Sequence, residues 1–157
     1  MSNTQEFDKD TKAKFKNLVT EITVAMMATK LGETPLHIVP MMTKKVDDLG
    51  NIWFLSGGHS DHNGHIVNNP KTQLVYSDPK QMEFISVYGN AFISTDQSIL
   101  EDLYSKDDDR WFDGVTDPNL TAIKFTPKEA EFWDSTQNKY INLFKVRATS
   151  SAESYKP

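Results

Sequence analysis

The feature that most constrains the fold is a succession of short strand-like segments with turns and short helical segments between them. Parallel strands need crossovers of about a dozen or more residues, usually helices. Such crossovers are scarce here, so the sequence predicts a mainly β protein, a small antiparallel barrel with peripheral helices. Alternating apolar residues and β-branched or aromatic content predict strands at 23–29, 36–46, 52–55, 72–77, 82–95, 120–126 and 130–134.

Helical segments are expected at the margins of this barrel. Residues 8–21 have Phe15, Leu18 and Val19 on one face, which is typical of an amphipathic helix. Three further helices are expected: a short one at 61–68 capped by Ser60 or Asp61, one that begins after Asp96, and a closing one at 139–146.

The remaining signals concern turns and domain limits. Gly89 within the strand at 82–95 predicts a bulge, and residues 126–129 read as a turn. A chain of 157 residues can bury one sizeable core, so we expect a single domain over 8–147. The Ser-rich segment 148–157 has no periodic apolar face and is expected to be a disordered tail.

Composition excludes several functional classes. The chain has no cysteine, which rules out disulfides, cysteine nucleophiles and thiolate metal sites. The absence of cysteine is compatible with a location in the reducing cytoplasm. The net charge of -5 argues against nucleic acid as a partner. The first twenty residues have no apolar signal region, and no segment is apolar enough to span a membrane. Motifs of serine hydrolases, P-loop proteins and dinucleotide-binding folds are absent.

One cluster of residues favours a binding site. His59, His62 and His65 lie within seven positions, but on one helix the outer pair diverge by roughly 120°, so all three cannot easily bind one metal ion. A solvated loop and helix is the simpler interpretation. The same glycine-containing loop opens a helix, where backbone amides can bind an anion and His62 can donate a proton. His37 lies on a distant strand, and the sequence does not say whether it joins the cluster.

A series of short motifs gives a more specific indication. They are residues 24–29, 37–42, 52–60, Pro70, Tyr76-Ser77-Asp78-Pro79, 85–89, Trp111-Phe112, Asp117-Pro118, Thr126-Pro127 and 131–135. In this order and spacing they resemble the general stress protein branch of the pyridoxamine 5'-phosphate oxidase-like flavoproteins. The resemblance runs from about residue 15 to 144. It implies a split β-barrel that binds FMN at the interface of a homodimer.

The resemblance also implies positions for the flavin contacts. The strand at 39–44 would pass along the flavin, and Lys44 stands where the oxidases place a basic residue toward substrate phosphate. Trp111 and Trp133 would close the pocket or approach from the partner subunit. The remaining implied contacts are Val39, Pro40, Met41 and Met42 on that strand, Leu55, Ser56 and Gly57 at the polar edge or ribityl chain, and Ser60 and His62 at the phosphate.

Three positions depart from the family pattern. The family usually has Arg where this chain has Val39 and Lys where it has His62, and the oxidases add an Arg where it has Asp61. Each lost charge-assisted contact to phosphate weakens binding by about 1.5 to 3 kcal/mol. The resemblance implies an FMN-binding oxidoreductase that acts on an unidentified small molecule, and the lack of a signal segment predicts a cytoplasmic location. The alternatives are a non-catalytic, stress-response cofactor-binding protein, a site for a different flavin or a deazaflavin, and a histidine-dependent haem or metal binder.

Overall fold

All the strands belong to one antiparallel sheet in the computed structural model, which describes residues 9–145. None of the helices within these residues is long and apolar enough to cross a membrane. The predicted tail and the outermost residues of the predicted domain lie outside the described part of the chain. The elements are α1 (Lys9–Ile22), β1 (Val24–Thr29), β2 (His37–Met42), β3 (Lys45–Val46), β4 (Ile52–Gly57), α2 (Asp61–Asn68), β5 (Lys71–Asp78), β6 (Glu83–Ser94), α3 (Gln97–Leu103), the 3-10 helix η1 (Lys106–Arg110), β7 (Leu120–Asp134) and β8 (Lys139–Lys145).

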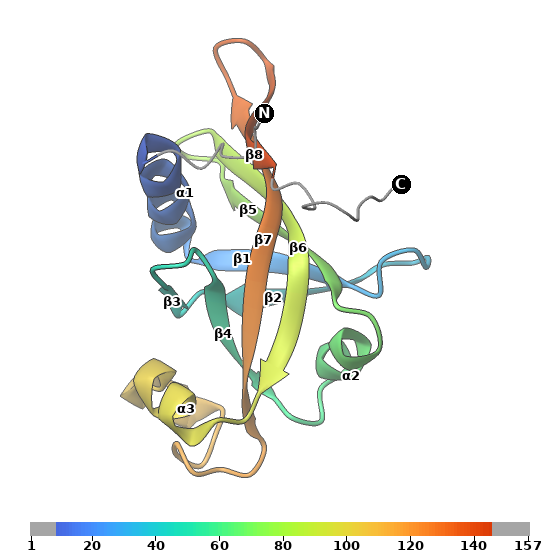
Figure 1. The fold of residues 1–157 in the computed structure, drawn as a ribbon, viewed down its shortest axis with the longest axis vertical. Coiled ribbons are helices and arrows are strands. Elements are labelled where there is room, and N and C mark those ends of the chain that lie inside the picture. Colours follow the sequence, from blue (N-terminus) through green and yellow to red (C-terminus); the bar gives the residue numbers. More distant parts are fainter. Residues whose placement is uncertain (1–8, 146–157) are drawn as a thin grey trace.

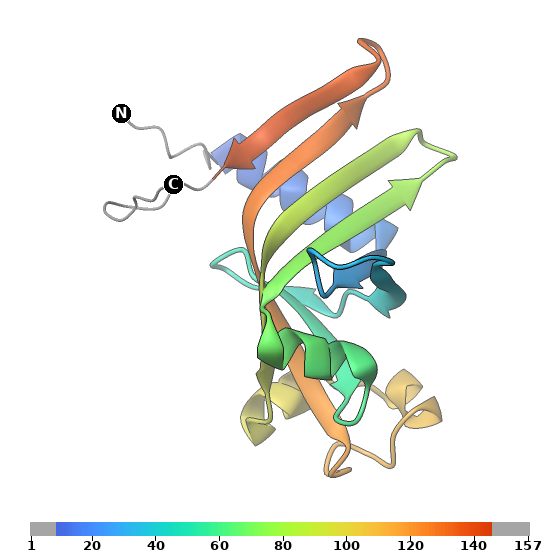
Figure 2. The same cartoon turned by 90° about the vertical axis from the view of Figure 1, so that its right-hand side faces the viewer.

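The connection between β2 and β3 makes the sheet curl. The strand order is β2-β1-β5-β6-β7-β4-β3, so β2 and β3 stand at opposite ends of this path. Only Thr43 and Lys44 separate them in the chain, and the sheet bends into a half-barrel to bring them together (Figures 1 and 2). Thr43 N donates to Thr23 O and Lys44 N donates to Trp53 O, each at 2.8 Å. The mainly β barrel prediction is confirmed, but the single strand predicted at 36–46 is wrong because these two residues redirect the backbone from β1 to β4.

Strand β7 joins the two halves of the sheet. It pairs with β6 along its length, with β4 over its first half and with β8 over its second half. The turn predicted at 126–129 is wrong, because the strand continues through Pro127. The predicted bulge is confirmed, since the register of β6 and β7 shifts between Tyr88 and Gly89. A Cβ atom at Gly89 would overlap the Thr126 carbonyl oxygen, so the close approach at this bulge requires glycine.

The closing helix predicted at 139–146 is also wrong. Residues 139–145 form strand β8, which hydrogen-bonds to the second half of β7 (Figure 2). Tyr140, Ile141, Leu143 and Phe144 fit a helical face and a strand almost equally well, and periodicity over so short a segment does not separate them. The otherwise unpaired edge of β7 decides the outcome, because its backbone groups gain hydrogen bonds from a strand and none from a helix.

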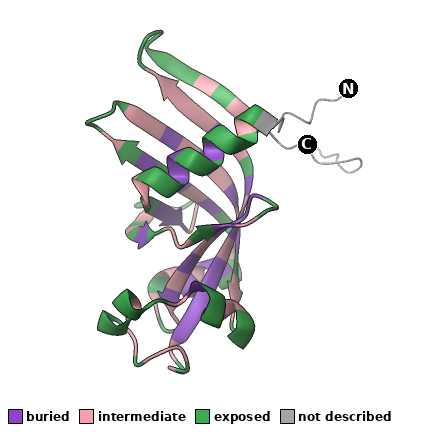
Figure 3. Ribbon diagram, turned by 90° about the vertical axis from the view of Figure 1, so that its left-hand side faces the viewer, coloured by how far each residue is buried: buried purple, intermediate pink, exposed green. Residues whose placement is uncertain are grey.

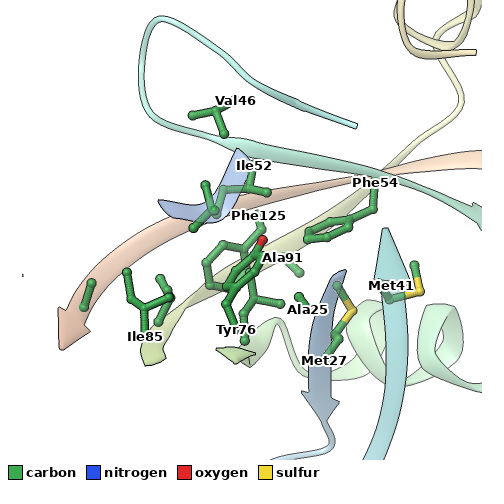
Figure 4. Packing of buried hydrophobic residues seen from close by; sticks show 14 of the residues in the cluster. Ala25, Met27, Met41, Val46, Ile52, Phe54, Tyr76, Ile85, Ala91 and Phe125 are labelled. Carbon is green, nitrogen blue, oxygen red and sulfur yellow. The ribbon is translucent and has the colours of Figure 1, made fainter. Parts of the chain in front are cut away.

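The other three helices form as predicted, and α1 covers the main core. It lies across one face of the sheet, with its exposed residues turned outward (Figure 3). Phe15, Leu18 and Val19 are buried there, and the Phe15 ring meets the edge of Phe144 with centroids 5.2 Å apart. Figure 4 shows the side chains that pack beneath the curled sheet, among them Met27, Met41, Phe54, Tyr76, Ile85 and Phe125.

A second, smaller core lies at the opposite end of the molecule from the β7–β8 hairpin (Figure 1). Leu100 and Leu103 of α3 are buried against Leu120 and Ala122 of β7. The Asp96 carboxylate caps α3 by accepting a hydrogen bond from Ser98 N at 2.9 Å, as the sequence predicts. Partly buried side chains that pack against this core include Leu55 and Phe112. The small core therefore holds the segment after η1 next to β4, where the candidate site lies.

Candidate functional site

A cavity of about 400 Å³ lies between β2, β4, α2 and the segment that contains η1. Its lining is mostly apolar, with a few polar groups at particular points, as is usual for sites that bind small molecules. The lining residues are Val24, Pro40, Met41, Met42, Lys44, Leu55, Ser56, Gly57, His62, Asp108, Trp111 and Phe112.

Nine of the twelve residues implied by the sequence line this cavity, and the structure places the other three elsewhere. Val39 packs against the main core. Ser60 caps α2, where its hydroxyl accepts a hydrogen bond from Asn63 N at 3.3 Å. Trp133 lies on β7 against Tyr140, with ring centroids 5.1 Å apart. The role implied for Trp133, an approach from a partner subunit, remains a prediction.

Three lining residues are not among the twelve that the resemblance implies: Val24, Asp108 and Phe112. Val24 begins β1 and pairs with Met42, so a correct pairing of the first two strands would have found it. Phe112 adjoins Trp111, which was a candidate. Asp108 belongs to an acidic run that reads as a solvated loop, and no local signal indicates that it faces Lys44.

Strand β2 gives the cavity its apolar wall. Side chains alternate across the strand, so Met41 points into the core and is buried, while Pro40 and Met42 lie on the outer face and are exposed. Methionine side chains are soft and polarizable, which suits contact with a flat aromatic ligand. Trp111 is also exposed, and it contributes an aromatic surface to the same cavity.

A buried polar network fixes the position of α2. Ser56 Oγ donates to Asn63 Oδ1 at 2.8 Å, and Asn63 Nδ2 donates to Thr121 Oγ1 at 2.9 Å. These residues come from β4, α2 and β7, and all three are buried. Because their polar groups find partners with one another, the network holds the start of α2 against the sheet. His62, in the first turn of α2, is thereby fixed at the cavity wall.

An ion pair crosses another part of the cavity wall. Lys44 Nζ lies 2.7 Å from Asp108 Oδ2, and both side chains are about seven-eighths buried. The same carboxylate accepts a hydrogen bond from Ser105 N at 2.9 Å. Burial by itself would raise the pKa of Asp108, but the hydrogen bonds from Lys44 and Ser105 outweigh it and lower the pKa. The ammonium of Lys44 is thus already paired within the chain.

Three histidines meet beside the cavity, including the one whose place the sequence left open. The ring centroids of His37 and His65 are 4.7 Å apart, and those of His37 and His62 are 6.4 Å apart. Within residues 9–145, no three histidine, aspartate or glutamate side chains are arranged to hold a metal ion. His59 is exposed, and its backbone N–H donates to Asn119 Oδ1 at 3.2 Å. This histidine cluster therefore consists of His37, His62 and His65.

These features define a class of protein: a split-barrel protein with a largely apolar cavity and a histidine cluster beside it. The family described as "Pyridoxamine 5'-phosphate oxidase like" matches residues 10–155. The chain belongs to this family.

The chain is similar in sequence or in fold to several general stress proteins. It is 27% identical over 81 residues to General stress protein 26 of Bacillus subtilis, an alignment that covers 50% of this chain and 58% of that relative. A Clostridium acetobutylicum protein related to general stress protein 26 shares the fold, with a TM-score of 0.75 and 23% identity over 89% of this chain and 97% of the other. The general stress FMN/FAD binding protein of Xanthomonas citri has a TM-score of 0.70 and 21% identity over 91% and 99%.

The residues present fit a flavin unevenly. The apolar wall of Pro40, Met41 and Met42, with Trp111 on the same cavity, suits the flat ring system. Among the positions implied for the phosphate end, Val39 is uncharged and packs against the main core, and Lys44 is paired with Asp108. What the wall offers to a phosphate is His62, whose Nε2 atom is buried without a hydrogen-bond partner. The donor set fits a flavin phosphate through imidazole rather than through the usual guanidinium and ammonium groups.

Proposed function

We propose that this protein binds FMN in the cavity between β2 and β4 and that it works as a flavin-dependent oxidoreductase on a small molecule. The observation that carries the proposal is the cavity itself, in which an apolar wall of β2 and the Trp111 ring occur together with His62. The family membership and the Xanthomonas citri FMN/FAD binding protein support the choice of a flavin. We also propose that the protein is cytoplasmic, because its first twenty residues have no apolar signal region.

The proposal includes a homodimer, which an exposed apolar face supports. Strands β1, β2 and β5 carry several large apolar side chains that are exposed: Val24, Met26, Ile38, Met42 and Val75. Cross-strand partners share one face of a sheet, and Met26 pairs with both Pro40 and Val75. We call this set, together with Pro40, the outer apolar patch. Large exposed apolar patches mark interaction sites.

The patch and the cavity share residues. Val24, Pro40 and Met42 belong to the outer apolar patch and also line the cavity. A second copy of the chain seated on the patch would therefore lie next to the cavity and complete its wall. This continuity favours a site shared by two subunits over one contained in a single chain.

The flavin, when bound, supplies the electron or hydride transfer chemistry. The described chain supplies position: β2 and Trp111 hold the ring system, and the polar network of Ser56, Asn63 and Thr121 fixes α2 next to it. The Lys44–Asp108 ion pair secures the segment that leads to Trp111.

The test is a titration of untagged protein with FMN, riboflavin and FAD, followed by absorption and by quenching of flavin fluorescence. The proposal predicts that one FMN binds per chain and that its fluorescence is quenched on binding. NADH or NADPH should then reduce the bound flavin faster than free flavin. Binding without accelerated reduction would leave the non-catalytic cofactor-binding alternative. Absence of any flavin binding would overturn the proposal and direct the search to haem or metal ligands.

A further inference from the structure

The histidine cluster joins two elements that are distant in sequence. His37 begins β2, whereas His62 and His65 lie on α2. The rings of His37 and His65 meet edge to face at 81°, and those of His37 and His62 are tilted by 30°. His65 Nδ1 lies 3.0 Å from the hydroxyl of Thr29, which is fully buried on β1. Only His62 of the three lines the cavity.

Two nitrogen atoms of the cluster are buried without a hydrogen-bond partner, whereas His65 has its partner in Thr29. The Nε2 atoms of His37 and His62 are buried and have no partner. None of the ion pairs found in residues 9–145 includes any of the three histidines. Buried polar atoms without partners are uncommon in native proteins and call for an explanation, often an absent ion or ligand. In this cluster two imidazoles have such an atom.

The electrostatic surroundings oppose protonation as long as no anion is present. Burial lowers the pKa of His62, and His37 on β2 and His65 on α2 lower it further. Asp61, at the start of α2, acts in the opposite direction but does not outweigh them. The other charged groups that line the cavity, Lys44 and Asp108, neutralise one another. An added negative charge next to His62 would oppose these effects and favour its protonated form.

We propose that the histidine cluster is a proton-coupled anion site, in which the phosphate of a bound flavin is balanced by protons taken up by His62 and its neighbours His37 and His65. This inference rests on the proposed function. It explains how the chain can hold a phosphate although Val39 is uncharged and Lys44 is bound to Asp108. It also gives a role to His37, which joins the cluster from β2.

Such a site binds with a characteristic pH dependence. If binding takes up one proton at His62, the affinity falls by about tenfold for each pH unit between the pKa of His62 in the free protein and its higher pKa in the complex. A site made of arginine and lysine behaves differently, because those groups stay charged up to high pH and the phosphate itself gains charge with a pKa of about 6. Riboflavin has no phosphate, so its binding reports on the ring site alone.

The experiment measures the affinity of FMN and of riboflavin between pH 6.5 and 8.5 by fluorescence quenching. Calorimetry in two buffers of different ionisation enthalpy counts the protons taken up. We expect FMN affinity to fall by at least tenfold across this range, with about one proton taken up at its lower end, while riboflavin affinity stays constant. His62→Gln and His37→Gln should remove both the pH dependence and the preference for FMN. His59→Gln is the matched control, because His59 is exposed and outside the cluster, and should change neither.

The outcomes separate this inference from the proposed function. If FMN binds with no proton uptake and with pH-independent affinity, the inference is wrong and flavin binding stands. If neither FMN nor riboflavin binds at any pH, both the proposed function and this inference fail. The wild-type measurements decide between these outcomes even if one of the glutamine variants does not fold, which circular dichroism would reveal.

Discussion

Lys44 Nζ and Asp108 Oδ2 lie 2.7 Å apart although 64 positions separate these residues in the chain. The pair connects the segment between β2 and β3 to η1, just before Trp111 and Phe112. A second ion pair, Lys45–Asp102, has the same 2.7 Å separation, but its side chains are 47% and 57% exposed, against 14% and 13% for the first pair. The two pairs share the same separation but differ in burial and in the hydrogen bonds that Asp108 also accepts from Ser105.

Removing the lysine of the buried pair should destabilise the fold. Lys44→Met leaves the Asp108 carboxylate largely buried without its cation, which should cost about 1 to 3 kcal/mol of unfolding free energy. Lys45→Met, at the exposed pair, should cost less than about 1 kcal/mol. Urea denaturation measures both values. Equal losses in the two variants would show that burial of the first pair has no energetic consequence.

The carboxylate of Asp47, in the turn between β3 and β4, should make the stability of the fold depend on pH. Burial would raise the pKa of Asp47, but hydrogen bonds from Trp53 Nε1, from Asn51 and from Leu49 N lower it below its ordinary value. Because the folded pKa is the lower one, this stabilisation is present above the unfolded pKa of about 4 and is lost as the pH falls through the folded value.

Replacing this aspartate should therefore weaken the fold at neutral pH and flatten its response to acid. Asp47→Asn should cost roughly 1 to 2 kcal/mol at pH 7, and it should reduce the slope of stability against pH below about pH 4. Asp48→Asn, at the exposed neighbouring position, is the control. Thermal melts from pH 2.5 to 7 test this, and an unchanged acid slope for Asp47→Asn would contradict it.

Two glycines should respond in opposite ways to alanine. At Gly89 a Cβ atom would overlap Thr126 O and lie 2.9 Å from the Phe125 ring, so Gly89→Ala should destabilise by more than about 2 kcal/mol. At Gly64, within α2, a Cβ atom meets nothing within 4 Å. Gly64→Ala should therefore stabilise by up to about 1 kcal/mol. Melting temperatures of both variants check the prediction, and a stable Gly89→Ala variant would refute the account of the bulge.

The outer apolar patch predicts how the chain associates. Met26→Lys places a charge in the middle of the patch and should convert a dimer to a monomer and weaken FMN binding at least tenfold. Val67→Lys, on the exposed side of α2, changes another exposed apolar residue and should leave association intact. Sedimentation velocity distinguishes these states. A Met26→Lys variant that remains dimeric would place the interface elsewhere.

Much of this fold could be predicted because local patterns and tertiary pairing agree over most of the chain. The helix at 8–21 appears as α1 (Lys9–Ile22), Asp96 caps α3 as predicted, and Ser60 is the one of the two predicted caps that α2 uses. The errors occur where pairing overrides a local signal. Pro127 is tolerated inside β7 because it lies at a bulge, and β8 forms because the edge of β7 needs a partner.

Part of the candidate site could also be predicted. The resemblance to the family implies Pro40, Met41 and Met42, which lie together on one strand and line the cavity. Contacts between distant segments could not be predicted, because nothing near Asp108 indicates Lys44 and nothing near His37 indicates His62 and His65. These contacts depend on the curl of the sheet, which a pattern of strands does not specify.

The measurement that tests the central claim most directly is a methyl NMR spectrum of protein with 13C-labelled methionine methyl groups, recorded during titration with FMN. The methyl signals of Met41 and Met42, assigned by single substitution to leucine, should shift through ring currents of the bound flavin. The signal of Met82, which is exposed in the turn between β5 and β6, should not move. Flavin binding that leaves Met41 and Met42 unshifted would contradict the assignment of the flavin site to this cavity.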